Sequence, residues 1–85
     1  MNYKLEFTRS ASKQFLKMGK SLRDRAQIAL EKLTDPVLFH SLNIKKLRAP
    51  KEGYRLRVGD YRILFIKEQN LITIHDVGHR KDVYK

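Results

Sequence analysis

The sequence contains no cysteine among its 85 residues. This absence excludes a disulfide framework, a thiol nucleophile and a cysteine-ligated metal. The three histidines, at positions 40, 75 and 79, do not have the spacing of a zinc site. The acidic residues form no cluster suited to a two-metal nuclease centre. We therefore expect a protein that uses neither a metal nor another cofactor.

Long apolar segments are also missing from the sequence. No stretch approaches the ~20 apolar residues of a membrane-spanning helix, and the first six residues lack the apolar core of a signal peptide. Repeats, low-complexity segments and linkers are absent as well. We therefore expect a single domain over residues 1–85 with a small core, located in the cytoplasm and not associated with a membrane.

Acidic residues are scarce relative to basic ones. Nine Asp and Glu stand against 19 Lys and Arg, which gives a formal charge of +10. This excess favours a polyanionic partner: nucleic acid, the ribosome or an acidic protein. For any single basic residue, an exposed and solvated side chain is the simpler interpretation. The residues assigned here to RNA or ribosome binding are Lys45, Lys46, Arg48, Lys51 and Lys81.

The apolar patterns predict an α+β domain with the order β-α-α-β-β-β. Strands are expected at 3–7, 54–58, 61–67 and 70–77, and a short strand or an extended loop at 44–48. Helices are expected at 11–18 and 22–33. Gly19 should end the first helix and Asp35-Pro36 the second. The strands should form a small antiparallel sheet with the helical hairpin packed on one face and the other face open.

The most informative local signal is the Gly59-Asp60 turn, which fits a two-residue hairpin connection. Such a turn pairs Val58 with Tyr61 and places Arg57 directly opposite Arg62. Like charges in that position reduce stability, so we expect the pair to hold an anion, and phosphate in particular. If Glu68-Gln69 form the next turn, Arg62 also faces His75, although a longer loop fits that segment too.

A basic and aromatic group near the end of the chain fits phosphodiester cleavage without a metal. RNA carries its own nucleophile, the 2′-hydroxyl, so an enzyme need only align it, move protons and stabilise the charged transition state. Arginine suits charge stabilisation because its fork of donors matches phosphate and stays charged. The candidate catalytic residues are Arg55, Arg57, Arg62, Arg80 and Tyr84, with His79 as an auxiliary acid or base.

These motifs resemble the RelE/ParE superfamily of toxins, and most closely its RelE-like ribonucleases. The matching segments are 46–48, 54–57, 59–65 and 77–84, so the resemblance covers nearly the whole chain. It implies a toxin of a type II toxin–antitoxin system that cleaves messenger RNA in the A site of the 70S ribosome. It also implies inhibition by a small, RelB-like acidic antitoxin.

The resemblance assigns the functional positions residue by residue. Arg55 and Arg57 match the two basic positions of one strand, which are often lysine in that branch. Arg62 matches the arginine that opens the next strand, and Arg80 and Tyr84 match the C-terminal pair, here with shorter spacing. Two alternatives remain open: a ParE-like inhibitor of DNA gyrase, and a basic RNA- or ribosome-binding module without catalysis.

Overall fold

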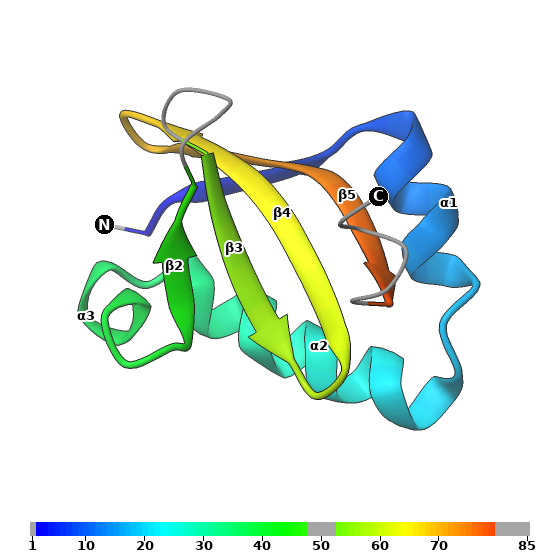
Figure 1. Ribbon diagram of the computed structural model, residues 1–85. Coiled ribbons are helices and arrows are strands. Elements are labelled where there is room, and N and C mark those ends of the chain that lie inside the picture. The colour runs from blue at the N-terminus through cyan, green and yellow to red at the C-terminus, as the bar shows by residue number, and fades with distance from the viewer. Residues whose placement is uncertain (1, 48–52, 80–85) are drawn as a thin grey trace.

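The computed structural model describes residues 2–47 and 53–79, which form a sheet with helices on one of its faces (Figure 1). The elements are β1 (Lys4–Phe7), α1 (Arg9–Leu16), α2 (Lys20–Leu33), α3 (Pro36–Phe39), β2 (Ile44–Lys46), β3 (Gly53–Val58), β4 (Tyr61–Glu68) and β5 (Leu71–His79). The five strands have the order β1-β5-β4-β3-β2. In Figure 1, α2 crosses behind the sheet and α1 runs alongside β5. None of the described helices covers the opposite face, as the sequence predicted.

The sheet is mostly, but not entirely, antiparallel. β2, β3, β4 and β5 pair antiparallel with their neighbours, whereas β1 pairs parallel with β5. The parallel pair corrects the expectation of a purely antiparallel sheet. It arises because the helical segment carries the chain from β1 at one edge of the sheet to β2 at the other edge, where β2 runs opposite to β1. The three reversals of the β2–β5 meander then bring β5 beside β1 in the same direction. Residues 44–46 prove to be a strand, and α3 is an additional short helix.

The helix boundaries follow from local capping. Thr8 begins α1, where its hydroxyl oxygen accepts a hydrogen bond from the Ala11 N–H at 3.1 Å. The first helix ends at Leu16, and Gly19 is the N-cap of α2 without a side-chain capping bond. The prediction that Gly19 terminates the first helix is therefore wrong. Asp35-Pro36 ends α2 as expected and begins α3, with the Asp35 carboxylate accepting from the Val37 N–H.

The core lies between the sheet and the two longer helices. The fully buried large side chains are those of Leu33, Leu56, Ile63, Phe65, Ile72 and Ile74. Phe65 stacks on Tyr54 with ring centroids 5.3 Å apart and meets Phe39 edge to face. Burial of these side chains supplies most of the driving force for folding. It also fixes which face of β3 and β4 points away from the helices.

The register of the central hairpin is the predicted one. Val58 pairs with Tyr61 and Arg57 with Arg62. Gly59 has a φ of 60°, a conformation that a side chain with a Cβ adopts at a cost. The turn therefore depends on glycine at this position, and it determines where the arginines of both strands lie.

The register between β4 and β5 differs from the expected one by three residues. The turn is formed by Gln69 and Asn70, so Glu68 pairs with Leu71. Moving the turn by one residue shifts the register by two. A β-bulge adds the third shift, because Leu64 pairs with Asp76 and Phe65 with Ile74, which leaves His75 as the extra residue. Arg62 consequently lies opposite Gly78, and the predicted Arg62–His75 pairing is wrong.

We expect Gly59→Ala to lower the free energy of unfolding by about 1–2 kcal/mol, the cost of a side chain in left-handed backbone. Asp60→Ala is the matched control, because it alters the same turn at a residue whose φ is not positive. Urea unfolding of both variants provides the measurement. Equal stability of Gly59→Ala and the unsubstituted protein would contradict the turn geometry.

Candidate phosphate-binding site

Two arginines from adjacent strands converge on the tip of the β3–β4 hairpin. Arg57 Nε donates to the Gly59 carbonyl oxygen at 3.4 Å, and Arg62 donates to the same oxygen through a terminal guanidinium nitrogen at 3.3 Å. Arg62 also donates to the Tyr61 carbonyl oxygen at 3.2 Å. One carbonyl oxygen therefore holds two positive groups close together. The backbone of the turn supplies partial negative charge to them.

The two arginines differ sharply in exposure. Arg57 is exposed, whereas Arg62 is only 7% exposed. Within the part of the chain that the structure describes, Arg62 Nε is buried without a hydrogen-bond partner. A buried charged donor left unsatisfied is costly, and an anion could supply the missing acceptor. The pair thus combines a fixed, buried cation with an accessible one.

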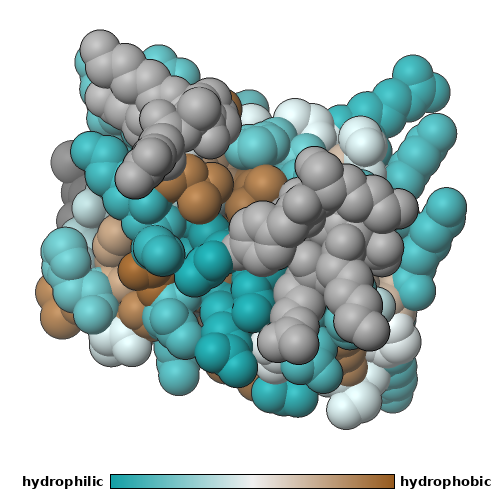
Figure 2. Space-filling view, in the orientation of Figure 1, coloured by the Kyte–Doolittle hydropathy of each residue, from teal (hydrophilic) through white to brown (hydrophobic). Residues whose placement is uncertain are grey.

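A second pair of like charges lies on the same face. Lys45 of β2 is opposite Arg55 of β3, and the alternation of β3 places Arg55 on the side of Arg57. Lys45, Arg55, Arg57 and Arg62 are named the basic face below. In Figure 2, hydrophilic side chains occupy the middle of this side of the molecule, over β3 and β4. Four cations on one small sheet can bind a polyanion such as a nucleic-acid backbone.

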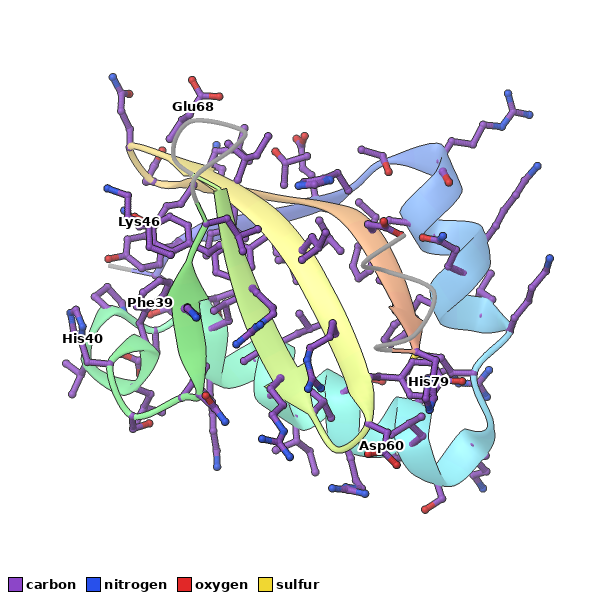
Figure 3. The ribbon with its side chains drawn as sticks, in the orientation of Figure 1. Phe39, His40, Lys46, Asp60, Glu68 and His79 are labelled. Atoms are coloured by element: carbon purple, nitrogen blue, oxygen red, sulfur yellow. The ribbon has the colours of Figure 1, made fainter. Side chains whose placement is uncertain are left out.

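Lys46 does not belong to the basic face. It pairs with Tyr54 and lines a separate cavity of about 350 Å³ with Phe39, His40 and Leu42 among others. Figure 3 shows Lys46 on the same side of the molecule as Phe39 and His40, far from Asp60 of the hairpin turn. The sequence placed Lys45 and Lys46 in one binding group, but strand alternation sends their side chains to opposite faces.

His79 ends β5 beside the hairpin tip. It pairs with Tyr61, and the two rings meet edge to face with centroids 5.8 Å apart. Because Tyr61 and Arg62 are consecutive, their side chains lie on opposite faces of β4. His79 is therefore next to the basic face but on the helix side of the sheet. Figure 3 shows it at the same end of the molecule as Asp60.

The remaining predicted site residues lie outside the described residues. They are Arg48, Lys51, Arg80, Lys81 and Tyr84. Within the described ranges, no group of three or more histidine and acidic residues could hold a metal ion. Among those same residues, no helix is long and apolar enough to cross a membrane.

Sequence reasoning missed the contribution of α1 to this end of the molecule. The Gln14 side-chain oxygen accepts a hydrogen bond from the Val77 N–H of β5 at 2.9 Å. β1 pairs with β5 only as far as Ile74, so α1 takes over the free edge of β5 beyond that residue. A glutamine on an amphipathic helix gives no sequence signal for such a contact.

Comparison with known proteins gives consistent results. A family model described as the ParE toxin of type II toxin–antitoxin system, parDE, matches residues 5–84. Toxin RelE3 of Methanocaldococcus jannaschii is 29% identical over 83 residues, which cover 95% of this chain and 94% of that protein. Both results confirm the resemblance inferred from the motifs.

Solved structures show the same fold. The toxin in the RelB–RelE antitoxin–toxin complex from Methanococcus jannaschii superposes with a TM-score of 0.79 at 29% identity, covering 93% of this chain and 94% of that one. The intact E. coli RelBE complex contains a chain with a TM-score of 0.74 at 23% identity, covering 91% of this chain and 95% of that one. The predicted α+β, RelE-like fold is confirmed.

We expect Arg57→Gln to raise the free energy of unfolding by up to about 1 kcal/mol, because it removes one of two like charges that face each other. Arg57→Lys keeps the charge and should bring no such gain. The advantage of Arg57→Gln should shrink as salt rises from about 0.01 M to about 1 M, where the Debye length falls from roughly 30 Å to roughly 3 Å. Urea unfolding at both salt concentrations tests this, and a gain independent of salt would argue against repulsion.

Proposed function

This chain belongs to the ParE toxin family of type II toxin–antitoxin systems, within the RelE/ParE superfamily, and we propose that it is a ribosome-dependent endoribonuclease. In this proposal it cleaves messenger RNA in the A site of the 70S ribosome and so stops translation in the cytoplasm. The observation that carries the proposal is the Arg57–Arg62 pair, two cations that converge beside a turn, with a buried Arg62 donor that has no partner among the described residues. Two adjacent positive charges complement the negative charge of the RNA phosphate at which cleavage takes place.

The chemistry needs no cofactor in this proposal. The 2′-oxygen of the RNA attacks the adjacent phosphorus, the bond to the 5′-oxygen breaks, and the products are a 2′,3′-cyclic phosphate and a 5′-hydroxyl. Arg57 and Arg62 stabilise the extra negative charge on the phosphorane, and Arg55 and Lys45 hold the neighbouring backbone. Arginine remains protonated throughout, so the proton transfers require other groups.

Tyr84 is the proposed proton acceptor or base-stacking residue, and Arg80 is placed near the leaving oxygen. These two roles follow from the resemblance, since both residues lie outside the described ranges. His79 is proposed as an auxiliary contact. Its ring packs against Tyr61 on the helix side of the sheet, which fits a supporting role better than direct attack chemistry.

The proposed regulator is a cognate small acidic antitoxin. RelE from M. jannaschii is found in complex with RelB, and this chain has a formal charge of +10. An acidic chain would be steered toward the basic face and would neutralise it, with an association rate that falls as salt increases. An antitoxin bound there would also block access of RNA to the arginine pair.

Inhibition of DNA gyrase is the second candidate function. It is favoured by one observation, that the matching family model is described as a ParE toxin. A protein that poisons gyrase by binding would not need the two arginines held against one carbonyl oxygen. The two functions differ in their cellular signature, since one yields cut messenger RNA and the other yields DNA damage.

The distinguishing experiment is to induce the toxin in cells and map messenger ends across the transcriptome. We expect new 5′-hydroxyl ends in phase with the reading frame. Arg57→Ala and Arg62→Ala should lose about 10²–10³ in cleavage rate, as is typical when a transition-state charge contact is removed. Lys32→Ala, which removes an exposed charge on α2, is the control and should cut normally. Intact messengers with induced DNA repair would instead establish gyrase inhibition.

A second prediction separates the two proposed proton carriers. Tyr84→Phe retains a stacking ring but loses the hydroxyl, so we expect a large loss of single-turnover cleavage on programmed ribosomes. His79→Gln should lose much less, because its ring lies against Tyr61. Normal cleavage by Tyr84→Phe together with an inactive His79→Gln variant would reverse this assignment.

A further inference from the structure

A cavity of about 350 Å³ opens beside the basic face, at the end of the sheet where β5 finishes. It is lined by Gln14 and Lys17 of the α1 region, by Tyr61 of β4 and by residues 76–79 of β5. Gly78, which lines the cavity, is the strand partner of Arg62. Gly78 lies on the same face of the sheet as Arg62, whereas Tyr61 and His79 lie on the helix side. The cavity is therefore lined from both faces of the sheet at the end of β5.

The orientation of the Gln14 amide in this cavity is fixed by its hydrogen bond. The Val77 N–H is a donor, so the atom that meets it at 2.9 Å must be the Gln14 carbonyl oxygen Oε1. The Gln14 NH₂ group is left with its two donors directed elsewhere. Gln14 is half-buried and its position is held by the strand edge, which makes it a preorganised donor on the cavity wall.

The other walls provide complementary groups. Tyr61 and His79 bring two rings in edge-to-face contact, and the polar residues Lys17 and Asp76 also line the cavity. A planar heterocycle with donors and acceptors on its edge can use such a set, by stacking on a ring and hydrogen bonding to the polar groups.

We propose that this cavity is a nucleobase subsite, which binds the base of a nucleotide next to the cleaved phosphate. The proposal rests on the proposed cleavage of RNA and extends it, because the basic face binds only the backbone and cannot distinguish one sequence from another. Gln14 is then a specificity-determining residue. Its amide donors hydrogen-bond to the edge of the base, while Tyr61 or His79 provides the stacking surface.

Gln14→Glu tests the role of the amide with little structural change. The glutamate keeps an oxygen for the Val77 N–H but replaces the NH₂ donors by a second acceptor oxygen. Ser12→Glu is the matched control, because Ser12 is exposed on the same helix outside the cavity and the substitution changes the charge equally. Equal melting temperatures of the two variants would show that any difference in binding does not come from folding.

The binding experiment uses a DNA analogue of the RNA, which lacks the 2′-hydroxyl and cannot be cleaved by it, so the measurement does not depend on catalysis. Full-length protein labelled with ¹⁵N is titrated with a trinucleotide carrying 2′-deoxyribose at every position, and with the same backbone lacking the central base. We expect amide shifts at Gln14, Val77 and Gly78 with the complete trinucleotide only. Gln14→Glu should bind it about tenfold more weakly, the loss of one good base contact, and Ser12→Glu should bind it like the unsubstituted protein.

Two outcomes would overturn the subsite. Identical shifts at these amides with the baseless backbone would show that the cavity responds to phosphate alone, and unchanged affinity in Gln14→Glu would remove the amide from recognition. Failure of the proposed RNA cleavage would give a different result. The protein would still bind the trinucleotide in a base-dependent way, but messenger RNA on programmed ribosomes would stay intact.

Discussion

The arrangement of this end of the protein depends on one two-residue turn. Because Gly59 adopts a positive φ, β3 and β4 are paired in a register that sets Arg57 against Arg62. Two like charges that face each other across a strand pair reduce stability. The fold accepts this cost, and within the described residues it leaves a buried Arg62 donor without a hydrogen-bond partner. Both features support the proposal that an anionic ligand binds here and that the pair has a catalytic role.

The helices make this possible by covering only one side of the sheet. Burial of Leu56, Ile63 and Phe65 against the helical side directs the intervening arginines of β3 and β4 to the other side. β1 pairs with β5 only as far as Ile74. Beyond it, Gln14 of α1 accepts the hydrogen bond of the Val77 N–H at the edge of β5. The packing of α1 against the edge of β5 also brings the polar side chains of α1 close to the proposed phosphate site. In the proposals above, the contacts that stabilise this end of the molecule also serve recognition.

The sequence predicted the parts of the fold that have strong local signals. The hairpin at Gly59-Asp60 was predicted with its register. A glycine in the first of two connecting residues is typical of a tight hairpin turn, and the length of the turn fixes which residues pair. The β4–β5 register was wrong, because Gln69 adopts positive φ without being glycine and because nothing local announces a bulge at His75. The parallel pairing of β1 is a long-range contact that periodicity cannot reveal. For the same reason the contact of Gln14 across the fold was missed. Lys45 and Lys46 were grouped together because the sequence left residues 44–48 as either a short strand or an extended loop, and only a strand places neighbouring side chains on opposite faces.

The central claim is that Arg57 and Arg62 repel each other in the free protein and that phosphate relieves the repulsion. A double-mutant cycle measures this directly, using urea unfolding of the unsubstituted protein, Arg57→Gln, Arg62→Gln and the double variant. The measurements are made in chloride and in phosphate at equal ionic strength. The account predicts an unfavourable coupling energy in chloride that falls in phosphate, with phosphate stabilising the unsubstituted protein most. Effects that add within about 0.3–0.5 kcal/mol in both salts, with equal stabilisation of all four proteins by phosphate, would contradict it.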